Sequence, residues 1–376
     1  METIVQTVLA HGRETPDKLA LALKAQQMTY GQLCSHITAA ADRLQKEHGI
    51  QKGDLLMISA VSKPEYVIAT LAVQYLHAVS VPIDKSAKTG TLRELGAFIR
   101  PKLALTDAKL DDPNLQKASL RELCAAAAEG TDVLPYRQPD EDSLAELLFT
   151  TGTTGKPKCV MLTYGVVYAN TWNTWKNIGI KGEDRILLPL PLNHSFGLRV
   201  LRAALYAGAS VILQNGFTFA KDLETNIKTY RCTGMASVPA SMEMLCRQMG
   251  EHFAQALGGL RYIEIGAGSL PVDRKRKLLE QLPNVRLYNT WGSSETGGAV
   301  FLDCTAHQDK LDTIGRPGEG IAFKAVDPEG RAIQARDLNS AGRMALRGPM
   351  QMAGYYHMPE ATAEALVDGW MFTNDM

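Results

Sequence analysis

Residues 150–158, TTGTTGKPK, decide the fold; they lie between the apolar runs LAELLF and VML. Glycines let backbone N–H groups converge on an anion, threonine hydroxyls add donors, and lysine adds positive charge. The Walker A loop does not fit, because only two residues separate Gly152 from Gly155 and Pro157 follows Lys156. The stretch therefore predicts a polyphosphate-binding loop of another kind, with a flexible Thr/Gly hairpin as the structural alternative.

Between residues 54 and 292, short apolar or β-branched runs alternate with longer segments of helical periodicity. This alternation is typical of a parallel sheet covered by helices. We predict strands at 55–60, 79–83, 144–150, 185–190, 210–213, 234–238, 262–265 and 285–290. We predict helices at 63–76, 165–177, 196–206, 222–230, 240–249 and 272–282. Thr29 and Gln32 have the spacing of a capping box for a helix that runs toward His48.

After about residue 300 the sequence changes to short strands and turns, as in FKAVDPEGRAI. We therefore expect an α/β part over residues 1–300 and a smaller β-rich lobe over residues 301–376. Residues 125–142 are expected to form a surface connection.

Charge and cysteine usage exclude several classes of protein. The 376 residues carry 40 Lys and Arg against 40 Asp and Glu, so nucleic acid is not expected as a partner. The basic run 274–277 is predicted to be an exposed helix face. The six cysteines lack CxxC spacing, which argues against zinc or a disulfide framework and favours the cytoplasm. No secretion signal and no membrane-spanning apolar run is present in this sequence.

Residues 149–164, FTTGTTGKPKCVMLTY, resemble the signature phosphate loop of the adenylate-forming superfamily, which contains acyl-CoA synthetases, nonribosomal-peptide adenylation domains and firefly-type luciferases. Its usual form is [ST][ST]G[ST]TGxPKGV; Cys159 replaces the usual glycine, and Tyr164 stands where many members have histidine. Cys159 is expected to be inert core. Three further motifs follow in the family's order: PLNHSFGL at 191–198, YNTWGSSETGG at 288–298, and the segment 342–376 that ends in GWMFTNDM. The resemblance covers most of the chain from residue 147 onward and is nearest to AMP-dependent acyl-CoA synthetases.

The resemblance implies the architecture of a large N-terminal adenylation domain over residues 1–376. The fold class is α/β. Two parallel-rich sheets pack with helices in a layered αβαβα core, beside a smaller β-rich lobe that forms a distorted barrel. Family members usually continue through a hinge into a C-terminal lid domain that carries the lysine needed for adenylation. Because this sequence stops one residue after Asp375, we expect the lid to be absent and the chain to be a truncated, weakly active fragment.

Each motif residue acquires a role by resemblance. His194 orients or gates the carboxylate, Ser294 contacts the α-phosphate, and Asp375 accepts hydrogen bonds from the ribose hydroxyls. The catalytic set is His194, Glu295 and Lys158, and the Mg²⁺ ligands are Thr151 and Glu295. The ATP-binding set is Thr150, Thr151, Gly152, Thr153, Thr154, Gly155, Lys156, Lys158, Gly266, Ala267, Gly268, Asn289, Thr290, Trp291, Gly292, Ser294, Glu295 and Asp375. The acyl pocket is His194, Ser237, Val238, Gly268 and Thr290.

The implied reaction uses ATP, Mg²⁺ and a small carboxylic acid to form an acyl adenylate and pyrophosphate. The acyl group then passes to coenzyme A or to the phosphopantetheine of an acyl carrier protein. PLNHSFGL lacks the aspartate of amino-acid-activating members, which favours a fatty or aryl acid without an α-amino group. Arg199 and Arg202 are expected to be exposed or structurally paired, with pairing to a second acidic group of the substrate as the alternative. A non-catalytic nucleotide-binding module and a domain that loads a carrier protein remain open, and the sequence indicates no oligomeric state.

Overall fold

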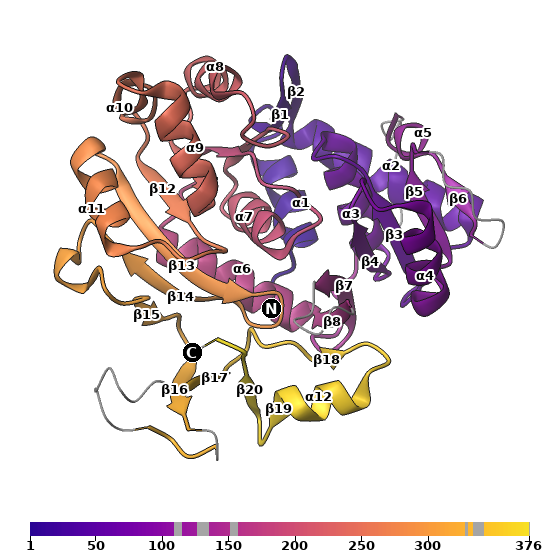
Figure 1. Cartoon of the computed structure of the whole chain (residues 1–376). Coiled ribbons are helices and arrows are strands. Elements are labelled where there is room, and N and C mark those ends of the chain that lie inside the picture. Colours follow the sequence, from indigo (N-terminus) through magenta and orange to yellow (C-terminus); the bar gives the residue numbers. More distant parts are fainter. Residues whose placement is uncertain (109–114, 126–134, 151–156, 328–329, 334–341, 376) are drawn as a thin grey trace.

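The computed structural model describes residues 1–108, 115–125, 135–150, 157–327, 330–333 and 342–375. These described residues form three sheets, which we call the large sheet, with nine strands, the second sheet, with seven, and the small sheet, with four. Figure 1 shows the large and second sheets side by side, with helices around them and the small sheet below.

The large sheet has the strand order β15-β14-β13-β12-β11-β9-β10-β1-β2. Its central strands and β1 pair in parallel, whereas β2, β14 and β15 pair antiparallel at the two edges. The strands are β1 (Leu19–Leu23), β2 (Gln26–Thr29), β9 (Arg185–Leu188), β10 (Ser210–Leu213), β11 (Gly234–Ser237), β12 (Tyr262–Ile265), β13 (Arg286–Ser293), β14 (Gly297–Asp303) and β15 (Arg316–Pro317).

The second sheet has the order β18-β8-β7-β4-β3-β5-β6. Its five strands from β7 to β6 in this order pair in parallel, and β8 and β18 add antiparallel strands at one edge. The strands are β3 (Leu55–Ser59), β4 (Val79–Ile83), β5 (Leu103–Thr106), β6 (Lys117–Ala118), β7 (Leu144–Thr150), β8 (Lys158–Thr163) and β18 (Gly354–Tyr355). The prediction of two parallel-rich sheets is therefore confirmed.

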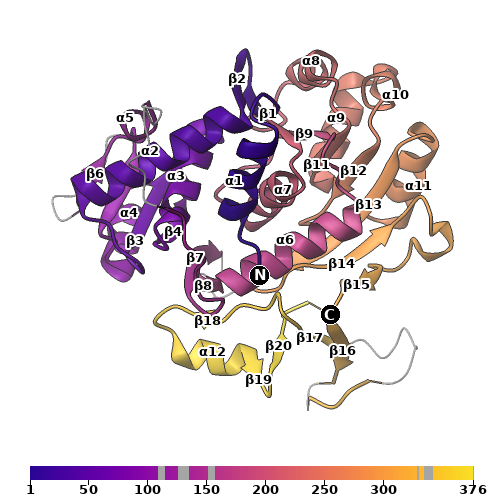
Figure 2. The ribbon, with the colours of Figure 1, turned by 180° about the vertical axis from the view of Figure 1, so that it is seen from behind.

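Helices lie between the two sheets and on their outer faces. α3 (Pro64–Tyr75), buried at every residue except Glu65, contacts β1 of the large sheet and β3 and β4 of the second sheet. α6 (Tyr164–Ile178) also contacts strands of both sheets. The other helices are α1 (Ile4–Glu14), α2 (Tyr30–His48), α4 (Thr89–Ile99), α5 (Leu120–Ala125), α7 (Ser195–Tyr206), α8 (Ala220–Tyr230), α9 (Pro239–Met249), α10 (His252–Leu257), α11 (Val272–Gln281) and α12 (Pro359–Ala365). Figure 2 shows α8 to α11 grouped on the outer side of the large sheet, which confirms the layered arrangement.

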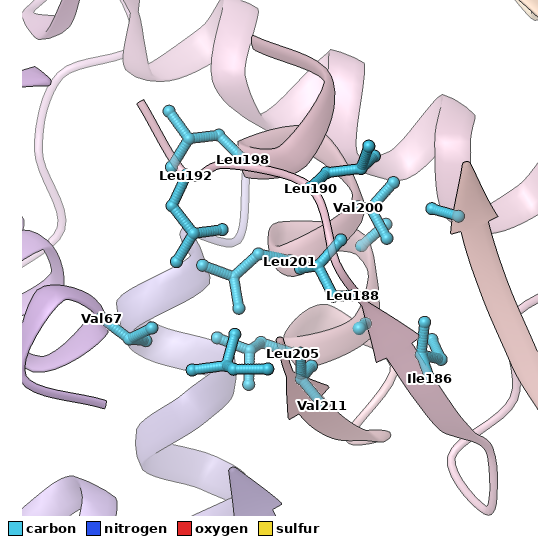
Figure 3. Close-up of a cluster of buried hydrophobic side chains, with 14 of the residues drawn as sticks. Val67, Ile186, Leu188, Leu190, Leu192, Leu198, Val200, Leu201, Leu205 and Val211 are labelled. Carbon is cyan, nitrogen blue, oxygen red and sulfur yellow. The ribbon is translucent and has the colours of Figure 1, made fainter. Parts of the chain in front are cut away.

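The largest core cluster includes the side chains that pack between the sheets. Figure 3 shows Val67 of α3 facing Leu201 and Leu205 of α7, with Ile186 of β9 and Val211 of β10 beneath them. All five side chains are buried. Burial of large apolar side chains stabilises a fold by about 1.5 to 3 kcal/mol each, so this cluster fixes α7, whose first turn reaches the candidate site.

The capping box at the start of α2 is confirmed. The Thr29 hydroxyl accepts a hydrogen bond from the Gln32 amide at 3.2 Å, and the Gln32 side chain accepts one from the Thr29 amide at 2.9 Å. Two amides that a helix start leaves without intrahelical partners are satisfied in this way.

The small sheet gives the chain the expected β-rich lobe, but its described strands run in the open order β16-β17-β20-β19 and do not close into a barrel. They are β16 (Ala322–Val326), β17 (Arg343–Arg347), β19 (Leu366–Val367) and β20 (Trp370–Phe372), after a 3₁₀ turn at Gln308–Lys310. The expected barrel is wrong because β15 and β18 pair with the two larger sheets instead. The turn expected at residues 328–330 lies partly outside the described residues, as does the surface connection at 125–142.

Candidate adenylate-binding site

A cavity of about 780 Å³ opens where β12 and β13 of the large sheet end. In an open α/β sheet, ligands bind outside the carboxyl ends of the parallel strands. Residues from six separate stretches line the cavity: Ser195, residues 267–272 with Lys275, residues 289–294, residues 311–314, Met344 and Asp375.

The loop after β12 forms one wall. Ala267 has a φ of +58°, the left-handed conformation that residues other than glycine seldom adopt, and this turns the chain away from the sheet. A Cβ at Gly266 would lie 2.6 Å from the Thr290 hydroxyl, so glycine lets β12 and β13 approach. The Asn289 side chain donates to the Ile265 carbonyl at 3.1 Å and ties the loop to β13. The cavity is lined by Ala267, Gly268, Asn289 and Thr290. Gly266 does not line it.

Trp291 and Asp375 meet across the cavity mouth. The indole Nε1 donates a hydrogen bond to the Asp375 carboxylate at 3.1 Å. The flat indole therefore stands next to an acceptor with free oxygen lone pairs, a combination suited to a purine and its ribose. This contact brings the motif at 288–298 next to the end of the segment 342–376.

The ends of the glycine-rich stretch lie on β7 and β8. Thr150 is the last residue of β7 and pairs with Lys158, the first residue of β8. The Lys158 ammonium lies over the Tyr355 ring, 4.8 Å from its centroid. The predicted residues Thr151, Gly152, Thr153, Thr154, Gly155 and Lys156 lie outside the described residues.

Glu295 is held by a tyrosine that sequence reasoning did not assign. The Tyr355 hydroxyl donates to the Glu295 carboxylate at 3.0 Å. Burial, followed by the Glu295 charge, raises the pKa of Tyr355 well above its ordinary value, so its hydroxyl stays a donor. The GYY sequence at 354–356 was within the quoted motif, but no spacing indicates that Tyr355 reaches a residue 60 positions earlier.

Glu295 fits a magnesium site with few protein ligands. Within the described ranges, no group of three or more His, Cys, Asp or Glu side chains is placed to hold a metal ion. Mg²⁺ bound with ATP needs only one or two carboxylates, because phosphate and water oxygens complete its octahedron. A single carboxylate oriented by Tyr355 meets that need, and Thr151, the other predicted ligand, lies outside the described residues.

The segment that contains His194 contacts this site through the next residue, Ser195. Ser294 donates to the Ser195 hydroxyl at 3.2 Å, which links the first turn of α7 to the turn between β13 and β14. His194 itself is exposed at the N-terminal cap of α7. Hydrogen bonds from Ser86 lower the pKa of Asp84, and nearby His194 and Asn193 act in the same direction.

A second cavity of about 50 Å³ adjoins the first. Thr290, Trp291 and Ser195 line both cavities, and Asn170, Phe196 and Arg199 line only the smaller one. Of the predicted acyl-pocket residues, Thr290 lines both and Gly268 lines the larger one. His194, Ser237 and Val238 line neither of these two cavities.

Arg199 and Arg202 are buried and paired with glutamates. Arg199 lies 2.5 Å from Glu264, and Arg202 lies 2.5 Å from Glu146. The expectation of structural pairing is confirmed. A lone glutamate in each of the apolar runs YIEI and LAELLF was the available sequence signal, because a buried charge needs a partner.

The prediction that the basic run 274–277 is an exposed helix face is wrong at Lys275. Within the basic run 274–277, Lys275 is only 4% exposed, so the run is not a uniformly solvated helix face. Its ammonium donates to the carbonyls of Leu311 and Thr313 at 2.9 and 3.2 Å, and burial lowers its pKa. This lysine therefore fastens α11 to the 311–314 wall of the large cavity.

Cys159 is fully buried, and burial raises the pKa of its thiol to about 12. A thiol with this pKa is protonated near neutral pH and does not act as a nucleophile. The prediction of an inert core cysteine is confirmed.

Comparison with known proteins agrees with this geometry. The family model described as "AMP-binding enzyme" matches residues 8–356. A 2-succinylbenzoate–CoA ligase from Bacillus velezensis is 29% identical over 96% of this chain and 73% of its own length. The structure of o-succinylbenzoate CoA synthetase (MenE) from Bacillus subtilis in complex with the acyl-adenylate intermediate OSB-AMP superposes with a TM-score of 0.87 at 25% identity, covering 98% of this chain and 74% of that one.

A second structure of the Bacillus subtilis enzyme, in complex with ATP and magnesium ion, has a TM-score of 0.85 at 25% identity and covers 98% of this chain and 75% of that one. The family model spans nearly the whole chain. The chain therefore belongs to the AMP-binding enzyme family, whose members include adenylate-forming acid–CoA ligases.

Proposed function

We propose that this chain activates a carboxylic acid with ATP, forms an acyl adenylate with release of pyrophosphate, and passes the acyl group to the thiol of coenzyme A. The observation that carries the proposal is the contact of Trp291 with Asp375 across a cavity that Ser294 also lines. Acyl-CoA synthesis by the ligase relatives supports it.

In the first step, a carboxylate oxygen attacks the α-phosphorus of ATP, and the bond from that phosphorus to the oxygen bridging to the β-phosphorus breaks. Pyrophosphate leaves with the bonding electron pair. Asp375 and Trp291 hold the ribose and the base, while Ser294 and Ser195 present hydroxyls to the α-phosphate. Catalysis then depends mainly on positioning and on stabilising charge that develops on phosphate oxygens.

Glu295, oriented by Tyr355, is the described residue suited to hold Mg²⁺. The ion supplies charge neutralisation for the triphosphate when bound. Lys158 adds a positive side chain at the edge of the phosphate region, where the ring of Tyr355 supports it.

In the second step, a thiol attacks the acyl carbonyl carbon and AMP leaves. Coenzyme A is the proposed acceptor because the ligase relatives are CoA ligases. The phosphopantetheine thiol of a carrier protein would react in the same way.

We also infer that residues 1–376 act as the large adenylation domain, with the β-rich lobe beginning near residue 301, and that the enzyme works in the cytoplasm. Its six free cysteines support a reducing compartment. Among the described residues, no helix has both the length and the apolar character needed to cross a bilayer.

Calorimetric titration with an acyl-sulfamoyl adenosine, a stable mimic of an acyl adenylate, tests the proposal. The mimic is expected to bind about 100-fold more tightly than ATP, because it occupies the nucleotide and acyl positions together. Equal affinity for the mimic and for sulfamoyl adenosine without an acyl group would instead support a non-catalytic nucleotide-binding module.

A further inference from the structure

The small cavity adjoins the nucleotide cavity and is much smaller than it. Ser195, Ala267 and Thr290 line both spaces, so a group attached to a bound adenylate can pass from one to the other. Its volume is about 50 Å³, well below the roughly 150 Å³ of a protein cavity that holds a benzene ring.

Two side chains close the far end against the backbone. A Cβ added at Gly297 would lie 2.6 Å from the Asn170 side chain, and one added at Gly298 would lie 2.8 Å from the Arg199 guanidinium. The side-chain Oδ1 of Asn170 also accepts a hydrogen bond from the Gly298 amide at 3.0 Å. Asn170 and Arg199 therefore pack directly on the β14 backbone and leave no deeper path at this point.

Arg199 is fixed in place by four neighbours. Its guanidinium contacts Glu264 at 2.5 Å, donates to the Thr174 hydroxyl at 3.0 Å and to the Thr290 hydroxyl at 3.4 Å, and lies 4.8 Å from the centroid of the Phe196 ring. Arg199 is 5% and Glu264 1% exposed, so the charges neutralise each other out of contact with water.

We propose that the acid taken by this chain is short and carries no second charge, and that the Arg199–Glu264 pair with Asn170 sets this limit. The proposal rests on the proposed adenylation function and specifies its substrate class. A longer acyl chain would have to displace Asn170 or Arg199. A second carboxylate would meet a guanidinium already neutralised by Glu264 and would leave a net negative charge buried.

The substrate class thus differs from that named for the ligase relatives. 2-Succinylbenzoate carries an aromatic ring and two carboxylates, and the space beyond Thr290 has neither the volume for the ring nor an unneutralised cation in its lining. A substrate ammonium group is also disfavoured, because Arg199 occupies the Glu264 carboxylate.

Binding of a series of acyl-sulfamoyl adenosines to the wild-type chain tests the limit. We expect acetyl and propionyl analogues to bind at least about tenfold more tightly than octanoyl, succinyl or 2-succinylbenzoyl analogues, since even one misfitting methylene costs that much in a closed pocket. Tight binding of all the analogues would keep the adenylation function and overturn the limit. If no acyl analogue binds more tightly than sulfamoyl adenosine, both proposals fail.

A paired variant assigns the limit to these residues. R199A alone would leave the Glu264 charge buried without a partner, whereas R199A/E264Q removes both charges and opens the end of the cavity. We expect R199A/E264Q to bind the octanoyl analogue about tenfold more tightly than wild type does. N170A opens the side of the small cavity that Asn170 closes and changes no charge. It should also shift the binding preference toward longer acyl analogues.

The neighbouring ion pair supplies a matched control. Arg202 lies on the same helix and is as buried as Arg199, and its partner Glu146 is fully buried, but neither lines the two cavities. R202A/E146Q should keep the wild-type preference for short analogues. If R199A/E264Q and N170A keep the wild-type preference for short analogues, these residues do not set the limit. An equal shift in R202A/E146Q would also overturn their assignment. Thermal melting of each variant verifies that it is folded.

Discussion

The indole Nε1 of Trp291 donates a hydrogen bond to the carboxylate of Asp375 at 3.1 Å, although the two residues are 84 positions apart. The contact joins the end of β13 to the segment that follows β20. It fixes the Asp375 carboxylate at the mouth of the nucleotide cavity, where the aspartate still has lone pairs for a ribose.

Replacing Trp291 by phenylalanine should weaken ATP binding about fivefold, because the aromatic face remains but the hydrogen bond of about 1 kcal/mol to Asp375 is lost. Calorimetric titration of wild type and W291F with ATP measures the change. D375N weakens the same acceptor and also its contact with the ribose, so the losses in W291F and D375N should be less than additive in a double variant, since the two residues are coupled. Fully additive losses would show that the contact does not position Asp375.

Lys275 should support nucleotide binding through the cavity wall. In K275M, the carbonyls of Leu311 and Thr313 lose a buried donor, so the 311–314 wall loosens and ATP affinity falls about threefold to tenfold. K277M, on the exposed part of the same helix, is the matched control and should bind ATP as wild type does. Equal ATP affinities in K275M and wild type would contradict this role.

Tyr355 should act on metal-dependent binding through Glu295. Y355F removes the 3.0 Å hydrogen bond that orients the carboxylate, and we expect it to weaken ATP binding about fivefold in Mg²⁺ while leaving binding in EDTA unchanged. E295Q should show the same pattern more strongly. Titrations with and without Mg²⁺ separate this effect from a general loss of structure, which would weaken binding in both conditions.

Asp107 should make the stability of the second sheet dependent on pH. Burial raises its pKa, but hydrogen bonds from Lys63 at 2.7 Å, the Arg121 amide at 2.9 Å and Ser119 at 3.0 Å outweigh burial and bring the pKa to about 2. Because this pKa is lower than the unfolded value of about 3.9, the carboxylate stabilises the fold at neutral pH, and the stabilisation is lost as pH falls from about 4 to about 2.

The D107N variant tests this dependence. Its free energy of unfolding should be about 1 to 2 kcal/mol below wild type at pH 7, after allowance for partial exposure, and the difference should shrink as pH falls toward 2. Urea unfolding at several pH values measures the difference. D140N, which affects the more exposed pair of Asp140 with Lys52, should have a smaller effect. A D107N deficit that does not change with pH would contradict the assigned pKa.

Much of the fold could be predicted from the sequence, because buried parallel strands appear as short apolar runs. The runs at 79–83, 144–150, 210–213 and 262–265 match observed strands to the residue. The alternation of short apolar runs with helical segments did not predict β1 or α4. β1 pairs with β10, about 190 residues later, and the turns on either side of it give no sign of that partner.

The candidate site was predictable in its motifs but not in its supporting contacts. Trp291, Ser294 and Asp375 could be assigned because each lies in a recognisable motif, and all three line one cavity. The sequence did not indicate the roles of Tyr355, Lys275 and Asn170, because each of them contacts a residue or backbone group that is distant in the sequence. Long-range contacts of this kind depend on how the elements pack, and local sequence patterns do not encode that packing.

The transfer of a carboxylate oxygen to AMP is the most direct test of acyl-adenylate chemistry. The chain, in excess over ATP so that one turnover is detectable, is incubated with Mg²⁺, coenzyme A and propionate labelled with oxygen-18 in its carboxylate. Attack of the carboxylate on the α-phosphorus predicts AMP that carries one labelled oxygen, detected by mass spectrometry. Unlabelled AMP, labelled orthophosphate together with ADP, or no nucleotide product would contradict the account.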